Sequence, residues 1–300
     1  MDNAITVLAG ATGNLGGRIA RAILERGANV RAVVRHKSDS DKVGELRKLG
    51  VAIAEVDFSS VSEVTGACQG GSCVISALSG LGDVIVDTQT LLLEAAVKAG
   101  VPRFIPSDYS IDFTKLPPGT NRNLDLRREF HERLDKAPIA ATSILNGMFT
   151  DLLTGEAPFI LFKLKRVVCW EDADQRLDFT TMDDTAEFAA AVALDFSTPR
   201  FLRIAGDQLS ARELMEVVSE VTGETFRLFR PGGLKRLEIL IKITRAILPK
   251  SNTLYPPWQG MQYMHNMFSG GAKLEPLDND RYPDMRWTTA RDVLAARQSR

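Results

Sequence analysis

Three glycines near the start of the chain have the spacing of a phosphate-binding turn. Gly10, Gly13 and Gly16 follow a strand-like apolar run and precede a stretch with helical apolar spacing. Such a turn aims backbone N–H groups and the positive end of a helix dipole at a pyrophosphate. Gly10 would permit the tight turn, Gly13 the approach of phosphates, and Gly16 the packing of helix on strand. A glycine turn without a ligand is the alternative, but the position between strand and helix favours dinucleotide binding.

A cation ends the second strand-like run, where an NAD-binding sheet usually carries an acidic residue. Arg35 occupies that place, and Lys42 follows a few residues later. A guanidinium offers paired donors to a phosphate, so the pattern predicts the 2′-phosphate of NADP(H). A solvated basic loop is the alternative, and the arginine at the strand exit favours the phosphate.

Three further strand exits supply candidate ligand contacts. Asp57 at the third exit can accept the adenine amino group while Phe58 covers the ring, or Asp57 can cap the following helix; the two alternatives are equally supported. Leu78 ends the fourth strand-like run, over 72–78, and Ser79 follows it; Asn146 follows the sixth, near the expected nicotinamide. The predicted cofactor contacts are Gly10, Thr12, Gly13, Asn14, Leu15, Gly16, Arg35, Lys42, Asp57, Phe58, Leu78, Ser79 and Asn146.

Strand-like runs alternate with helical stretches through the first half of the chain. The last of these runs covers residues 141–145. This alternation predicts an α/β fold with a Rossmann-type, doubly wound parallel sheet. Because parallel strands end at one edge, the candidate residues at their exits should gather there.

Beyond residue 150 the alternation loosens. We therefore predict an NADP(H)-binding domain over residues 1–150 and a smaller α+β substrate-binding or lid domain over 151–300. Part of residues 166–206 is expected to return to the first domain. A ligand cleft is expected between the two halves.

Composition limits the partners. The 300 residues carry a net charge of −1, which argues against a nucleic-acid surface. No apolar run reaches the ~20 residues of a membrane span; the nearest, 239–248, is interrupted by Lys242 and Arg245. The cysteines and histidines lack disulfide-framework or metal-ligand spacing. We expect a metal-free cytoplasmic protein, monomer or homodimer, that acts on a small molecule and has no nucleic-acid or membrane partner.

The chain resembles the NmrA-like, atypical short-chain reductases. Within these it is most similar to the isoflavone-reductase-like group, which includes pinoresinol-lariciresinol and phenylcoumaran benzylic ether reductases. Residues 10–16 resemble the family's phosphate loop, 103–109 (RFIPSDY) its RF-x-PSEFG segment, and 280–289 (DRYPDMRWTT) its ELYPDVKYTT segment. The resemblance covers nearly the whole chain. It implies NADPH as cofactor and hydride delivery to a small, often aromatic, acceptor: a carbonyl, an activated alkene or a benzylic ether.

The catalytic residues implied by the resemblance depart from the family. Arg127 stands where the family has a lysine, and an arginine can stabilise an oxyanion but cannot relay a proton. A solvated helix charge is the alternative for Arg127. Tyr109 replaces a family phenylalanine and is a candidate proton donor, although a tyrosine packed in the core is equally supported. Asp108, at the family's glutamate position, is expected to orient the loop backbone.

Two functions follow from these residues. The first is an NADPH-dependent reductase; the alternative is an NmrA-type, NADP(H)-binding redox sensor without turnover. Loss of the lysine favours the sensor, and the reductase-like segment over 280–289 opposes it. A sugar epimerase or dehydratase is disfavoured because Tyr109 is followed by Lys115, six residues on, and the Tyr-x-x-x-Lys pattern is missing.

Overall fold

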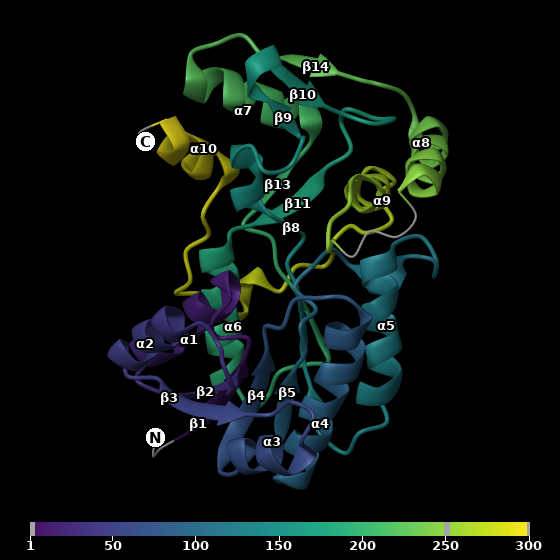
Figure 1. Ribbon diagram of the computed structural model, residues 1–300. Helices are drawn as coiled ribbons and strands as arrows, with labels where there is room; N and C mark the ends of the chain where they lie inside the picture. Colours follow the sequence, from purple (N-terminus) through teal and green to yellow (C-terminus); the bar gives the residue numbers. More distant parts are fainter. Residues whose placement is uncertain (1–3, 249–252, 299–300) are drawn as a thin grey trace. The chain divides into compact units, whose positions relative to one another are not determined.

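The computed structural model describes residues 4–248 and 253–298 and divides into two compact units (Figure 1). Unit 1 comprises the described parts of Met1–Tyr109, Leu126–Ile144 and Thr185–Leu202. Unit 2 comprises those of Ser110–Asp125, Leu145–Asp184 and Arg203–Arg300. Each unit is described separately below.

A six-stranded parallel sheet forms the centre of unit 1, in the order β3-β2-β1-β4-β5-β6. The strands are β1 (Ile5–Ala9), β2 (Asn29–Arg35), β3 (Ala52–Val56), β4 (Gly71–Ser76), β5 (Arg103–Ile105) and β6 (Ala140–Ala141). The order changes direction between β1 and β4, which is the topological switch point where such sheets bind ligands. The predicted Rossmann-type, doubly wound sheet is confirmed.

Helices connect these strands and bury their apolar faces on the sheet. They are α1 (Asn14–Glu25), α2 (Ser40–Lys48), α3 (Val61–Cys68), α4 (Gln89–Lys98), and α5 (Arg122–Leu134), of which Leu126 onward belongs to unit 1. Ile19, Ala20 and Ile23 form the buried face of α1. Phe104 of β5 and Phe130 of α5 are fully buried, with ring centroids 6.1 Å apart.

The predicted sixth strand, over 141–145, is wrong in its extent. β6 continues the large sheet, but β7 (Ser143–Leu145) pairs with β12 (Phe201–Arg203). The Thr142 amide still donates to the Phe104 carbonyl at 3.0 Å, whereas the Ser143 amide donates to Arg200 at 2.8 Å. The strand changes partner here because β5 is only three residues long.

A π-helical turn, η1 (Asp83–Thr88), precedes α4 at the exit of β4. Gln89 is fully buried beside it, and its Nε2 donates to the Ile85 carbonyl at 2.9 Å. Its Oε1 accepts from the Ser107 amide, also at 2.9 Å. One side-chain amide therefore ties the π-helical turn to the loop after β5.

A late segment of the chain, Thr185–Leu202, belongs to unit 1. It includes most of α6 (Met182–Leu194). The buried Arg103 of β5 donates to the carbonyls of Val192, at 2.9 Å, and Ala193, at 3.2 Å. A guanidinium at a helix C-terminus satisfies carbonyls that the helix leaves free, so Arg103 attaches α6 to the sheet.

Unit 2 contains two small mixed sheets and several helices. One sheet has the order β14-β10-β9 and the other β13-β11-β8. The strands are β8 (Met148–Phe149), β9 (Ile160–Leu161), β10 (Arg166–Val168), β11 (Leu177–Thr180), β13 (Asp207–Leu209) and β14 (Arg227–Phe229). The helices are α7 (Ala211–Thr222), α8 (Leu234–Ile247), α9 (Pro257–Phe268) and α10 (Ala290–Gln298), with 3-10 turns η2 (Phe113–Lys115), η3 (Thr150–Thr154), η4 (Phe162–Leu164) and η5 (Asn279–Arg281). Within the described chain, no helix is both long and apolar enough to cross a bilayer.

Candidate functional site

The carboxyl ends of the unit 1 strands lie along one edge of the sheet. Ala9 at the end of β1 pairs with Val33 of β2 and with Ser76 of β4, and Arg35 pairs with Val56. This register places the exits of β1 to β4 side by side. The candidate cofactor contacts that belong to unit 1 were predicted at these exits. Parallel α/β sheets bind their ligands at this edge.

The turn after β1 is closed against the exit of β4. Gly10 has a φ of +86°, and a Cβ there would lie 2.5 Å from the Ala77 carbonyl oxygen. A Cβ on Gly16 would lie 2.1 Å from the Gly10 carbonyl oxygen. Both distances exclude a side chain, so the backbone of β1, the turn and α1 pack in direct contact.

Helix α1 starts at this turn with exposed backbone. Gly13 is its N-cap residue and has an extended backbone. Because glycine has no side chain, the first turn receives no side-chain cap. Gly13 and Asn14 are exposed, whereas Thr12 and Leu15 are half-buried. A helix N-terminus left open in this way by glycine is a ready anion site, and it fits a pyrophosphate.

Arg35 and Lys42 are both exposed near the end of β2. The carbonyl of Arg35 accepts a 2.7 Å hydrogen bond from Ser38 Oγ in a tight turn. Lys42 lies in the first turn of α2, which Asp39 caps through the amides of Asp41 and Lys42. The basic segment is therefore a short turn and a helix start, and its guanidinium is accessible to a phosphate.

Asp57 does not cap the helix after β3, so that alternative is wrong. Its Oδ1 accepts from the Ser59 amide at 2.8 Å, and this hydrogen bond is the main cause that lowers the pKa of Asp57. The chain makes one more turn, and Ser60 caps α3 through the Glu63 amide. Phe58 is half-buried against the core of unit 1. Their contact with adenine stays a prediction.

Leu78 and Ser79 leave β4 at the switch point. Ser79 is exposed, and Leu78 is half-buried against the core. The Leu78 carbonyl accepts a 2.7 Å hydrogen bond from Ser107 Oγ. This bond and the Gln89 bond described above fix the loop after β5 next to the exit of β4.

Tyr109 is enclosed at the end of that loop. It is buried, and its hydroxyl has no hydrogen-bond partner among the described residues. Burial raises the pKa of the Tyr109 phenol, and the neighbouring Cys73 and Asp108 raise it further. The phenol is held in its neutral form and is a poor proton source. This geometry favours the packing alternative, and the catalytic role of Tyr109 stays a prediction.

A buried polar network behind the same loop was missed by sequence reasoning. Asp108 is fully buried, and its Oδ2 accepts from His131 Nε2 and from Ser143 Oγ, both at 2.6 Å. Arg200 donates to Ser143 Oγ at 2.6 Å and lies 3.3 Å from His131 Nδ1. Because an arginine only donates, His131 Nδ1 accepts and Nε2 carries the proton that faces Asp108. Asp108 thus anchors side chains of α5 and β7, whereas the sequence suggested the loop backbone.

Arg127 lies one helical turn before His131, on the same face of α5. It is half-buried, and its Nε is enclosed. Burial alone would raise the pKa of Asp108, but His131, Ser143 and Arg127 outweigh burial and lower it. Arg127 therefore helps to stabilise the ionised form of a buried carboxylate. A fully solvated helix charge, the alternative for Arg127, would not do so. The i, i+4 spacing of Arg127 and His131 was the signal available in the sequence.

Asn146 belongs to unit 2, directly after β7. Its backbone amide donates to Ser110 at 3.0 Å, and its carbonyl accepts from Thr180 Oγ1 at 2.7 Å. The side-chain amide is fully buried, and neither its oxygen nor its nitrogen has a partner in the described part of the chain. An unused donor and acceptor on one buried amide fit a ligand carboxamide.

The C-terminal segment that resembles the family has a structural role in unit 2. Thr288 donates to the carboxylate of Asp184 from its amide, at 2.8 Å, and from its hydroxyl, at 3.0 Å. Burial raises the pKa of Asp184, and these two hydrogen bonds oppose the rise. The Ala290 amide donates to Asp207 at 3.0 Å. The segment therefore binds α6 and β13 through two carboxylates.

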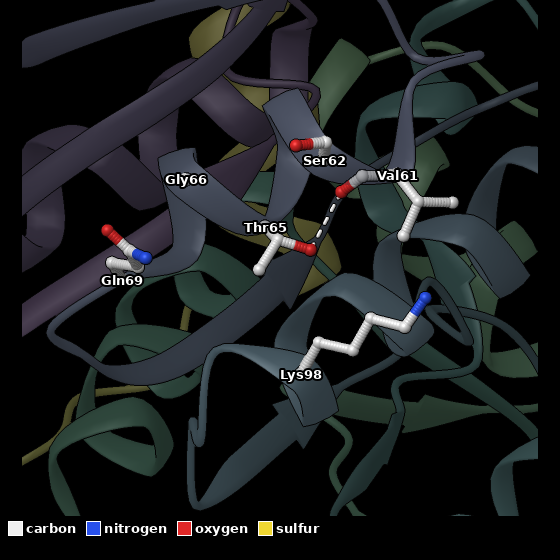
Figure 2. Close-up of a pocket in the computed structure, with 6 residues that line it drawn as sticks. All are labelled: Val61, Ser62, Thr65, Gly66, Gln69 and Lys98. Atoms are coloured by element: carbon white, nitrogen blue, oxygen red, sulfur yellow. Dashed lines mark hydrogen bonds between the residues drawn. The ribbon is translucent and has the colours of Figure 1, made fainter.

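A shallow hollow of about 670 Å³ lies between α3 and α4 (Figure 2). Its lining consists of Val61, Ser62, Thr65, Gly66, Gln69 and Lys98. The Thr65 hydroxyl already donates to the Val61 carbonyl at 2.7 Å. None of the predicted site residues lines this hollow, so it is separate from the strand exits. The described residues also contain no cluster of His, Cys, Asp or Glu able to hold a metal ion.

Known proteins similar to this chain agree with its fold and motifs. A model of the NmrA-like family matches residues 1–230. Pinoresinol reductase 1 from Arabidopsis thaliana is 29% identical over 317 residues, covering 96% of this chain and 95% of that protein. A solved structure of AtPrR2 with NADP+ and (+)pinoresinol superposes with a TM-score of 0.83 at 22% identity, covering 99% of both chains. An isoflavone reductase structure gives a TM-score of 0.83 at 19% identity, covering 98% of this chain and 99% of that chain.

The chain belongs to the NmrA-like family. The expected similarity to isoflavone-reductase-like and pinoresinol-lariciresinol reductases is confirmed by these matches.

The Asp108 network makes a pH-dependent prediction about stability. Asp108→Asn should lower the free energy of unfolding by about 3 kcal/mol at neutral pH, because His131 and Ser143 lose a buried charged acceptor. Because the pKa of Asp108 is lowered in the folded state, its ionised carboxylate stabilises the fold at pH values above its ordinary pKa of 3.8. This stabilisation is lost as the pH falls through the folded-state pKa. Urea unfolding should therefore show the two proteins converging at acid pH.

Ser143→Ala is the matched control, since it removes one neutral donor from the same carboxylate. It should cost about 1 kcal/mol, with little dependence on pH. Equal stability of wild type and Asp108→Asn at neutral pH would contradict an ionised Asp108.

Proposed function

We propose that this chain is an NADPH-dependent reductase that delivers hydride to a small aromatic or conjugated acceptor. The observation that carries the proposal is the backbone cradle of Gly10 to Gly16 at the switch point of the sheet, with Arg35 at the neighbouring strand exit. The similarity to pinoresinol reductase 1 and to AtPrR2 with NADP+ and (+)pinoresinol supports it.

Each part of the nucleotide has a candidate partner. The turn amides and the N-terminus of α1 would bind the pyrophosphate, with Thr12, Asn14 and Leu15 lining it. Arg35 and Lys42 would bind the 2′-phosphate.

The remaining contacts extend along the strand exits. Asp57 and Phe58 would contact adenine, and Leu78 and Ser79 would line the path along β4. The buried amide of Asn146 would hold the carboxamide. When bound, NADPH supplies the hydride.

Arg127 would stabilise the negative charge that develops on the acceptor. A guanidinium is a permanent cation, and Arg127 is near enough to the buried Asp108 carboxylate to help lower its pKa. The enclosed Tyr109 hydroxyl is poorly placed to give up its proton, so of the two candidate donors we favour water. We keep the prediction that residues 1–150 bind NADP(H) and that residues 151–300 supply the substrate-binding or lid domain.

The redox-sensor alternative keeps the same nucleotide site but has no turnover. The arginine at position 127 favours it, because no lysine is present there to relay a proton.

We place the protein in the cytoplasm, as a monomer or homodimer; the free, buried thiols of Cys68, Cys73 and Cys169 fit a reducing compartment.

Turnover separates the two candidates. Purified protein with NADPH should oxidise the nucleotide in the presence of at least one acceptor from a panel of quinones, enones, aldehydes and benzylic aryl ethers, followed by absorbance of the reduced nicotinamide. Tight, redox-selective nucleotide binding without turnover across the whole panel would instead establish the sensor.

Cofactor selectivity depends on Arg35. Arg35→Asp should weaken NADPH binding by about 1.5–3 kcal/mol, because a charge-assisted phosphate contact is lost, and should leave NADH binding nearly unchanged. Arg133→Asp is the control: Arg133 lies in the last turn of α5 and pairs with Glu129 of the same helix at 3.3 Å, and neither residue stands at a strand exit. Unchanged NADPH affinity in Arg35→Asp would remove Arg35 from the site.

The role of Arg127 is tested by comparing two variants. Arg127→Ala should lower kcat by roughly 10²–10³-fold, in line with the loss of an oxyanion donor, with NADPH affinity retained. Arg127→Lys should keep more of the rate because it restores a cation. Arg128→Ala, one position along the helix, should stay near wild type. Full turnover by both Arg127 variants would show that the assignment is wrong.

A further inference from the structure

Helix α8 of unit 2 exposes a stripe of isoleucines. Ile239, Ile243 and Ile247 are 55%, 50% and 72% exposed, and their spacing of four places them on one face. Leu237 is the one residue of α8 that is buried among the described residues. Leu248, directly after the helix, is exposed as well. In the sequence, the same stretch was the nearest approach to a membrane span.

The same helix is strongly basic. Lys235, Arg236, Lys242 and Arg245 are all exposed. Glu238 is the single acidic residue of α8, and it pairs with His265 of α9 at 3.0 Å. With four Lys or Arg and one Glu, α8 is locally basic, whereas the whole chain has a net charge of −1.

This combination selects among possible occupants of the surface. A second copy bound through the same face would bring two sets of cations together without acidic partners, which like-charge repulsion disfavours. An anionic lipid surface matches both features: isoleucines enter the boundary of the acyl chains while lysines and arginines meet the headgroups.

We propose that the face of α8 formed by Ile239, Ile243 and Ile247, with the nearby Lys235, Arg236 and Lys242, docks the protein on an anionic lipid surface. The helix would lie in the plane of the interface, so the proposal requires no membrane-spanning segment. It is independent of the proposed reductase activity, since none of these residues belongs to the candidate nucleotide site.

Vesicle co-sedimentation tests the proposal with the full chain. The protein should sediment with mixed phosphatidylcholine–phosphatidylserine vesicles, and much less with phosphatidylcholine alone. High salt should release it, because the electrostatic attraction is screened. The double variant Lys235→Gln/Lys242→Gln should bind roughly 30-fold more weakly, since each basic residue near such a surface contributes about 1 kcal/mol.

A second variant tests the apolar part. Ile243→Ser/Ile247→Ser should weaken binding by at least about tenfold, because two isoleucines that would enter the lipid boundary are lost. Leu164→Ser, at another exposed apolar residue of unit 2 (66% exposed), is the matched control and should bind as wild type does. An unchanged circular dichroism spectrum and Tm would show that each variant is folded.

Three results would overturn the proposal. The first is equal sedimentation with both vesicle types, and the second is wild-type binding by the isoleucine variant. The third is a concentration-dependent dimer, seen by light scattering and abolished by the isoleucine variant, without vesicle binding; that result would assign the face to a second copy.

Discussion

The contact between the glycine turn and the end of β4 is the constraint on which the rest of the site depends. A Cβ at Gly10 or Gly16 would lie inside backbone atoms, so the backbones of β1, the turn and α1 approach without intervening side chains. This contact fixes where the first turn of α1 opens along the sheet edge. The parallel register then places the ends of β2 and β3 next to it, which brings Arg35 and Asp57 to the same edge.

A second layer of interactions holds the loop after β5. Ser107 binds the β4 exit through Leu78 and the π-helical turn through Gln89, and Asp108 binds α5 and β7. The buried carboxylate is stable because His131 and Ser143 donate to it and Arg127 lies near enough to lower its pKa. If Arg127 takes the place of the family's lysine, as the resemblance implies, the nearby buried carboxylate favours a permanent cation there.

Local patterns were sufficient to predict the sheet and its ligand edge. Glycine spacing, strand periodicity and the type of residue at each strand exit are properties of neighbouring positions, so the first five strands and their exits could be predicted. The end of the sixth strand could not be predicted, because Ser143 changes its partner to Arg200, a residue distant in sequence. Asp57 was ambiguous for a related reason: only the extra turn that ends at Ser60 decides which residue caps α3.

The polar network around Asp108 was missed because its members are far apart in the chain. His131 lies in α5, Ser143 in β7 and Arg200 directly before β12, and the sequence spacing of the histidines does not report such contacts. The enclosure of Tyr109 likewise depends on packing that periodicity does not report. The short strands and turns of unit 2 are the least accessible to sequence reasoning, because two or three residues are too few to show a periodicity.

Calorimetric titration of the purified chain with NADPH tests the central claim most directly. The account predicts a saturable heat of binding with one nucleotide per chain, and markedly weaker binding of NADH, because the turn amides bind the pyrophosphate and Arg35 the additional phosphate. Absence of any heat with NADPH or NADP+ at millimolar concentration would contradict it, and the reductase and the sensor would then be excluded together.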